Sequence, residues 1–156
     1  IPKIAFLPIL TLWLGFFETS KIVMIAFNTI FPVITATIAG VYSVEKEIIW
    51  SARNLGTSER AMLWEILLPA AMPQIFTGLQ VALPIALIVG ILTEMAMGGY
   101  GIGGTMKTAS SMADSLTVFA GIVEIAVVGY LLVKLMAMLR RRLLKWHQES
   151  QETATV

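Results

Sequence analysis

Two carboxylates, Glu94 and Glu124, lie near or within long apolar runs of the sequence. An ionised side chain costs about 2.5–3.5 kcal/mol at the centre of a membrane, so it usually faces a cavity or a partner. Both glutamates are therefore candidates for lining a translocation path. The alternative for Glu94 is an interfacial carboxylate at a helix end. The alternative for Glu124 is a packed or hydrogen-bonded interior role.

Other familiar chemistry is weakly represented in the sequence. Residues 98–104 contain the pattern G-x-G-x-x-G from Gly99 to Gly104. A dinucleotide site would need a strand before this pattern and a helix after it, whereas the runs that flank it are typical of membrane helices. We interpret it as a turn that could act as a gate or as a docking surface for a binding protein.

Catalytic and metal sites find no support in the residue types present. His147 is the only histidine and the sequence contains no cysteine, so a zinc site and a Ser/His/Asp set are not expected. We therefore predict neither an enzyme nor a bound metal, and no paired catalytic groups occur within the apolar runs.

The composition indicates a membrane protein. Hydrophobic residues make up 57% of the 156 residues and charged residues 13%, against about 25% charged residues in an average soluble domain. Four apolar stretches stand out, at residues 4–17, 22–44, 66–93 and 116–139. The first is shorter than the roughly 20 residues that cross a bilayer. Because the chain also begins without Met, we expect further sequence upstream.

The basic residues predict an orientation. Placing segment 44–65 and the C-terminus in the cytoplasm puts nine Lys and Arg inside and only Lys21 and Lys107 outside. Cytoplasmic loops carry such an excess, so both ends of the chain are expected inside. The cluster formed by Arg140, Arg141, Arg142 and Lys145 is then a membrane-edge anchor, and no aromatic-interleaved basic surface suggests nucleic-acid binding.

A stripe of small residues marks the third apolar run. Gly78, Ala82, Ala86 and Gly90 are each four positions apart, a spacing that lets helix backbones approach closely in lipid. We expect a packing seam along this helix, with a kink at Pro84.

The polar segment 43–69 predicts two short helices. Ser43 is expected to cap the first, with Glu45 and Glu47 near its N-terminal end and Gly56 at its C-terminal end. The second is expected to be capped by one of the two hydroxyl residues after Gly56, Thr57 or Ser58, with Glu59 in its first turn and Pro69 separating it from the next span. The alternative to a specialised role is an interfacial amphipathic hairpin that only anchors the chain.

The spacing within this segment carries a family resemblance. Trp50-Ser51-Ala52-Arg53-Asn54-Leu55-Gly56, followed nine residues later by Ile66-Leu67-Leu68-Pro69, resembles the EAA loop of ABC importer permeases. The family pattern is Glu-Ala-Ala, three residues, Gly, nine residues, Ile-x-Leu-Pro, and the spacing matches without a gap. Two residues depart from the pattern: Trp50 stands where the family has Glu, and Ser51 stands where it has the first Ala.

Further segments resemble one branch, the nitrate/sulfonate/taurine-type permeases. These segments are the run from Phe6 to Gly15, Phe31-Pro32 with Ala39-Gly40-Val41, Leu68 to Leu79, Glu94, and Gly101-Ile102-Gly103. Ala36 replaces the Asn usual in the second segment. The resemblance covers the chain to about residue 148.

The resemblance implies an all-α membrane protein with about four transmembrane helices and a cytoplasmic coupling helix-turn-helix. Residues 1–148 would form the C-terminal part of a MetI-like permease domain, and residues 149–156 a cytoplasmic polar tail. The coupling loop, 43–69, would contact a separate ATPase subunit. The positions carried over to that contact are Trp50, Ser51, Ala52, Arg53, Gly56, Thr57, Ile66, Leu68 and Pro69.

The expected function is that of a permease subunit in a bacterial or archaeal cytoplasmic membrane. Its expected partners are the ATP-binding subunit, an extracytoplasmic substrate-binding protein, a second permease copy and membrane lipid, with ATP held by the partner chain and no cofactor here. Nitrate, sulfonates, taurine and small heterocycles all remain open as substrates. The alternative is a truncated, non-transporting membrane anchor or assembly protein.

Overall fold

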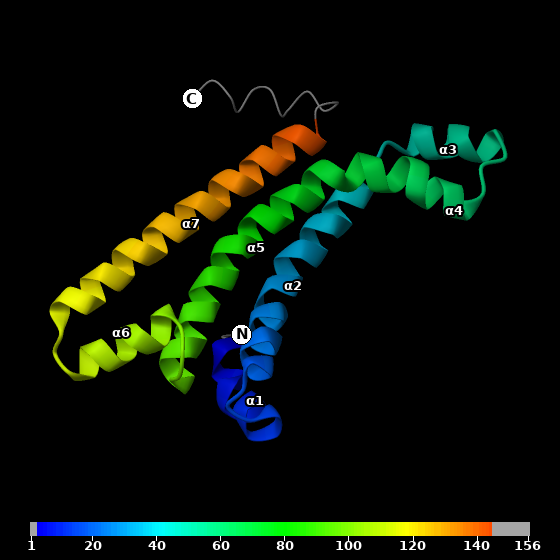
Figure 1. Cartoon of the computed structure of the whole chain (residues 1–156). Coiled ribbons are helices and arrows are strands. Elements are labelled where there is room, and N and C mark those ends of the chain that lie inside the picture. Colours follow the sequence, from blue (N-terminus) through cyan, green and yellow to red (C-terminus); the bar gives the residue numbers. More distant parts are fainter. Residues whose placement is uncertain (1–2, 145–156) are drawn as a thin grey trace. The chain divides into compact units, whose positions relative to one another are not determined.

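The computed structural model describes residues 3–144, and every regular element within them is helical (Figure 1). This confirms the predicted all-α class. The elements are a 3₁₀ turn η1 (Lys3–Phe6), α1 (Leu7–Leu14), α2 (Glu18–Tyr42), α3 (Lys46–Asn54), α4 (Glu59–Ala61), a π-helical stretch η2 (Met62–Leu67), α5 (Leu68–Met97), α6 (Ile102–Ser111) and α7 (Ser115–Leu143).

Three of these helices are long and apolar enough to cross a membrane: Glu18–Tyr42, Glu59–Met97 and Ser115–Leu143. The first predicted segment instead forms the shorter apolar helix Lys3–Leu14, which ends at Gly15. Only 6% of the most apolar window of α2, and of α7, is buried within the described residues. Such extensive bare apolar surface requires lipid or other membrane chains around it.

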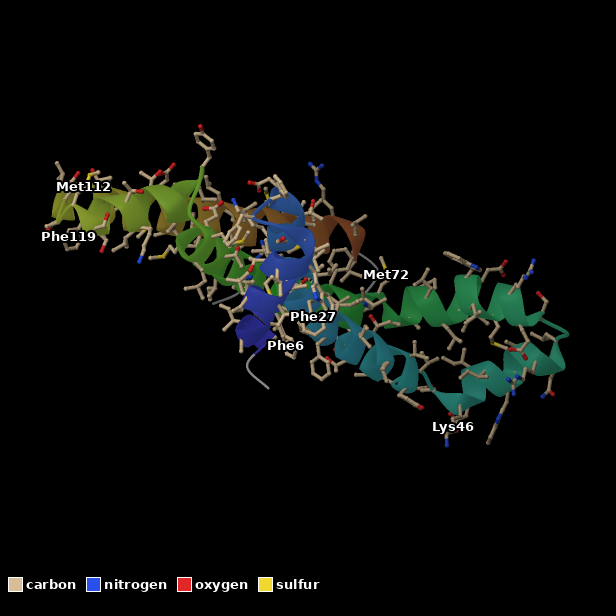
Figure 2. The ribbon with its side chains drawn as sticks, turned by 90° about the horizontal axis from the view of Figure 1, so that it is seen from below. Phe6, Phe27, Lys46, Met72, Met112 and Phe119 are labelled. Carbon is tan, nitrogen blue, oxygen red and sulfur yellow. The ribbon has the colours of Figure 1, made fainter. Side chains whose placement is uncertain are left out.

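The chain divides into two compact units, and the first comprises residues 3–31 and 82–135. Its core contains Leu7 from α1, Met24 from α2 and Val89 from α5. Phe6 and Phe27 are labelled near each other in Figure 2, and their rings meet edge to face with centroids 5.9 Å apart. These contacts hold the short N-terminal helix against α2, and α6 and α7 complete the unit.

The second unit comprises residues 32–81 and the described residues 136–144. It contains the end of α2, the beginning of α5, and a hairpin formed by α3, α4 and η2. The two arms of this hairpin, α3 and α4, lie beside one another in Figure 1. The hairpin interior is built from small and flexible apolar side chains, because Val44, Ala52 and Met62 are buried. We call residues 43–69 the coupling hairpin.

Pro69 does not separate the hairpin from the next span, so that prediction was wrong. Helix continues from Glu59 to Met97 through Pro69, Pro73 and Pro84. The π-helical stretch Met62–Leu67 lies directly before Pro69, and the Leu68 amide donates to the Leu63 carbonyl five residues back. This wider turn lies where a proline ring disturbs an α-helix, so the helix continues instead of ending.

Candidate functional site

The turn of the coupling hairpin is held by its own backbone. The Gly56 amide donates to the Arg53 carbonyl over 3.0 Å, and the Thr57 amide donates to the Ala52 carbonyl over 3.1 Å. Gly56 has a φ of +78°, the left-handed conformation that glycine adopts without steric cost. Together these contacts form a Schellman motif that ends α3. The structure therefore confirms the expected stop at Gly56.

The second arm of the hairpin begins at Ser58, whose hydroxyl oxygen accepts a hydrogen bond from the Ala61 amide over 3.3 Å. Of the two capping residues expected, the structure thus selects Ser58. Glu59 lies in the first turn and pairs with Arg53 across the hairpin at 3.4 Å. Both side chains are largely exposed, so this ion pair adds little to the stability of the hairpin and mainly orients its two arms.

Ser43 does not cap α3, contrary to prediction. Its hydroxyl donates to the Gly40 carbonyl over 2.8 Å and its amide donates to the Ala39 carbonyl. The residue directly follows α2, so its polar groups satisfy carbonyls at the end of that helix rather than amides of the next one. The N-cap position of α3 belongs to Glu45, which makes no side-chain capping bond.

Several large apolar side chains of the coupling hairpin are exposed, among them Leu55, Trp50 and Trp64. Leu55, at the tip, is 86% exposed and Trp50, on α3, is 59% exposed. Ser51 and Arg53 are exposed beside them, whereas Ala52 faces inward and is buried. An uncovered apolar tip with a polar surround is typical of a protein–protein contact.

The base of the hairpin contains a cavity of about 280 Å³. Leu63, Trp64 and Leu67 of the π-helical stretch line one side, and Thr37 and Val41 of α2 line another. Of the predicted coupling positions in this region, Leu68 lines the cavity, and Ile66 and Pro69 are half-buried nearby in the chain.

Within the second unit, α2 and α5 approach closely at two glycines. A Cβ built on Gly78 would lie 2.6 Å from the Ala36 Cβ and 3.0 Å from the Pro32 carbonyl oxygen. A Cβ on Gly40 would lie 3.0 Å from the Ala71 carbonyl oxygen. Gly40 escaped the sequence reasoning, although Ala36 and Gly40 repeat on α2 the spacing of four that marks small-residue contacts.

The other small residues of the α5 stripe have different surroundings. Ala82 is buried at 6% exposure. Ala86 and Gly90 line a cavity of about 410 Å³ in the first unit, together with Ile25 of α2 and Glu94. A Cβ on Gly90 would meet only the Ile25 Cδ1, at 3.5 Å. Close packing at the glycines of this stripe is therefore confined to Gly78.

Glu94 is bonded to the glycine-rich turn that joins α5 to α6. Its Oε2 accepts a hydrogen bond from the Gly103 amide over 2.9 Å. The carboxylate also lies where a Cβ of Gly101 would stand. Glu94 thus places its negative charge at the N-terminus of α6, where the helix dipole and free amides favour an anion. Helices flank the glycine run on both sides, and no strand precedes it from residue 3 onward.

Glu124 has a different environment. The side chain is exposed on α7 and has no hydrogen bond or ion pair within residues 3–144. It lines a cavity of about 310 Å³ together with Thr105 and Met106 of α6 and Thr117 and Gly121 of α7. The two carboxylates that the sequence singled out therefore border two neighbouring cavities of the first unit, which share Gly101 and Ile102 in their lining.

One polar contact was missed by the sequence reasoning. Within the second unit, an Arg140 guanidinium nitrogen donates to the Gln80 side-chain oxygen over 2.9 Å. The two residues are 60 positions apart, and only the presence of glutamine in a largely apolar run could have suggested it. Lys145, Trp146 and His147 lie outside the described residues.

Comparison with known proteins assigns these features to a family. The family described as binding-protein-dependent transport system inner membrane component matches residues 1–145. The chain is 36% identical over 151 residues to the taurine transport system permease protein TauC of Escherichia coli (strain K12), covering 97% of this chain and 55% of the relative.

Two further relatives belong to the same group. The putative aliphatic sulfonates transport permease protein SsuC of Bacillus subtilis (strain 168) is 36% identical, covering 94% of this chain and 53% of the relative. The riboflavin transport system permease protein RibX of Chloroflexus aurantiacus is 28% identical, covering 94% and 54%. The chain thus spans about half the length of these curated relatives.

The comparisons confirm the predicted family and its taurine/sulfonate branch, and they agree with a transport component rather than an enzyme. Together with three apolar helices of membrane length, they make the chain a multi-pass inner-membrane protein. The chain belongs to the binding-protein-dependent transport system inner membrane component family, and it is similar to the taurine and sulfonate permease proteins named above.

Proposed function

We propose that this chain is part of the permease subunit of an ABC importer, in which it lines the solute path and receives the motion of a separate ATP-binding subunit. The observation that carries this proposal is the unbroken helix from Glu59 to Met97. Its first residues form the second arm of the coupling hairpin, and its later residues form an apolar span. A displacement of the hairpin therefore has a direct mechanical connection to the span.

The surface offered to the ATP-binding subunit is the tip of the coupling hairpin. Leu55 and Trp50 supply exposed apolar area, and Arg53 supplies charge. The Schellman motif at Gly56 and the cap at Ser58 fix the tip, so less conformational freedom is lost when it binds. ATP itself is held by the partner, and this chain contributes no nucleotide site to the proposal.

The proposed orientation places the coupling hairpin and the C-terminal end of α7 in the cytoplasm and the Glu18 end of α2 on the opposite side, because three membrane-length helices leave the two ends of the described chain on opposite sides. The basic residues support it, since Lys46, Arg53, Arg60, Lys134 and the cluster at 140–142 are then on the cytoplasmic side, against Lys3, Lys21 and Lys107. A substrate-binding protein would then approach from the side of the glycine-rich turn. A second permease copy and lipid would cover the bare apolar faces of α2 and α7. The solute would be a small sulfonate, a taurine-like compound or a small heterocycle, following the names of the relatives.

The orientation can be tested with single cysteines, because the chain contains none of its own. We expect Leu55→Cys to react with a membrane-impermeant maleimide only in inside-out vesicles. Tyr100→Cys, on the glycine-rich turn and 98% exposed, should react only in right-side-out vesicles. Labelling of both sites from one side would contradict the orientation.

Coupling is tested in the assembled complex by inserting a charge at the hairpin tip. Leu55→Glu should abolish solute-stimulated ATP hydrolysis while leaving membrane insertion intact, because the contact would bury an unpaired carboxylate. Tyr100→Glu is the matched control, since it places the same charge at an equally exposed residue away from the hairpin. Full stimulation in Leu55→Glu would refute the coupling role. Insertion without any ATP-driven uptake in wild type would favour the membrane-anchor alternative.

A further inference from the structure

Glu124 is an ionisable residue that finds no partner within the described chain. It is the tenth residue of α7, which places it about 13 Å along the helix from Ser115 at 1.5 Å per residue. A carboxylate at that depth is strongly disfavoured against lipid tails, so it must face water or a counter-charge. No Lys or Arg lines the cavity that Glu124 borders.

The polar side chains that line this cavity have only hydrogen-bond acceptors to offer. Thr105 donates its hydroxyl proton to the Gly101 carbonyl over 2.9 Å, and Thr117 donates its own to the Asp114 carboxylate over 2.6 Å. Each hydroxyl oxygen therefore has only lone pairs left for a ligand. The carboxylate of Glu124 adds two further acceptor oxygens and a negative charge.

An anion would find little to attract it in the same place. Two helix N-termini that favour negative charge border the cavity, and each already holds a carboxylate: Glu94 accepts from the Gly103 amide at the start of α6, and Asp114 accepts from the Thr117 amide at the start of α7. The remaining lining is apolar and includes Met106 and Gly121. With a volume of about 310 Å³, the cavity is at the small end of ligand sites, which run from about 300 to 1,000 Å³.

We propose that this cavity binds the protonated amine of the transported solute, with Glu124 as its counter-ion and the oxygens of Thr105 and Thr117 as acceptors. The proposal rests on the function proposed above and narrows its substrate class. The solute carries an ammonium group, alone or in a zwitterion. A solute with only a sulfonate or a carboxylate is disfavoured at this cavity.

The test measures binding to the assembled permease–ATPase complex in lipid nanodiscs, without the binding protein. The probes are ethylammonium chloride and sodium ethanesulfonate, which have the same carbon chain and opposite charge. Isothermal titration at constant ionic strength should show saturable ethylammonium binding and none for ethanesulfonate. Glu124→Gln should weaken ethylammonium binding at least tenfold, and Glu124→Asp should retain most of it.

Two further variants separate the site from general effects. Thr105→Val removes one acceptor and should weaken binding several-fold, whereas Thr108→Val, on the same helix but outside the cavity lining, should leave it unchanged. Three results would overturn the proposal. They are equal affinity for the two probes, affinity for sodium ions as high as for ethylammonium, and equal ethylammonium affinity in wild type and Glu124→Gln. The assembled complex also reports solute-stimulated ATP hydrolysis. Intact stimulation without selective amine binding refutes this inference alone, whereas absent stimulation refutes the proposed function.

Discussion

Replacing Gly78 by alanine tests whether α2 and α5 owe their close approach to the missing side chain. The added Cβ would lie 2.6 Å from the Ala36 Cβ. Carbon atoms in contact prefer about 3.5–4.0 Å, so the helices would have to separate by about 1 Å at this point. Overpacking of this kind costs about 1–3 kcal/mol.

Gly90 supplies the matched control on the same helix. A Cβ there meets only the Ile25 Cδ1, at an ordinary 3.5 Å. Glycine in a helix interior is about 1 kcal/mol less favourable than alanine, so Gly90→Ala should stabilise the chain by up to that amount. Gly78→Ala receives the same benefit and the clash together, so the free energies of unfolding of the two variants should differ by about 1–3 kcal/mol.

The free energy of unfolding is measured by titrating the purified chain from mild-detergent micelles with sodium dodecyl sulfate, following helix content by circular dichroism. Gly78→Leu extends the series, because a larger side chain at the same contact should unfold at a still lower detergent fraction. If Gly78→Ala and Gly90→Ala shift the midpoint equally and in the same direction, the reasoning from the Ala36 contact is refuted.

Three further predictions follow from local geometry. Glu94→Ala should destabilise the chain by about 1.5–3 kcal/mol in the same titration, because the Gly103 amide loses a charged acceptor. Glu94→Gln should destabilise the chain less, because the glutamine side chain keeps a neutral acceptor oxygen. Gly56→Ala should lower the free energy of unfolding by about 1 kcal/mol through its φ of +78° alone, since no atom lies within 4 Å of the added Cβ. Ala113→Gly should raise the free energy of unfolding by a similar amount, because Ala113 has a φ of +55°. Changes of the same sign in the two variants would contradict this prediction. Hydrogen bonds from the Thr117 hydroxyl and amide lower the pKa of Asp114 in the folded chain. The stability that the ionised Asp114 gives to the start of α7 is therefore complete above the ordinary aspartate pKa of about 3.9 and is lost as the pH falls through the lower folded pKa. The thermal midpoint of Asp114→Asn should fall less than that of wild type between about pH 5 and about pH 3.

Features governed by neighbouring residues were predictable from the sequence. The charge-free runs predicted α2, the apolar part of α5 and α7, because length and apolarity suffice to define a membrane helix. Gly56, Ser58 and Glu59 predicted the hairpin turn, since helix ends depend on a few adjacent residues. The error at Ser43 has the same origin, because two helix ends compete for one hydroxyl and local pattern cannot rank them.

Features set by contacts between distant segments were not predictable. The close approach at Gly40 depends on Ala71 of another helix, and the Arg140–Gln80 bond joins residues far apart in the sequence. The continuity through Pro69 depends on a π-helical stretch whose residues carry no distinctive signal. This last error has the largest functional consequence, since a break at Pro69 would have disconnected the coupling hairpin from the span that it is proposed to move.

The two glutamates show how tertiary contacts separate residues that the sequence treats alike. Both are carboxylates in apolar runs, and the cost of a membrane-embedded charge applies to each. The Gly103 amide and the N-terminus of α6 stabilise the Glu94 carboxylate, so its charge is satisfied within the fold. Glu124 borders a cavity whose hydroxyl protons are already committed, so its charge remains for something outside the described chain. The residue without an internal partner is therefore the better candidate for solute recognition, and the satisfied one for holding the turn.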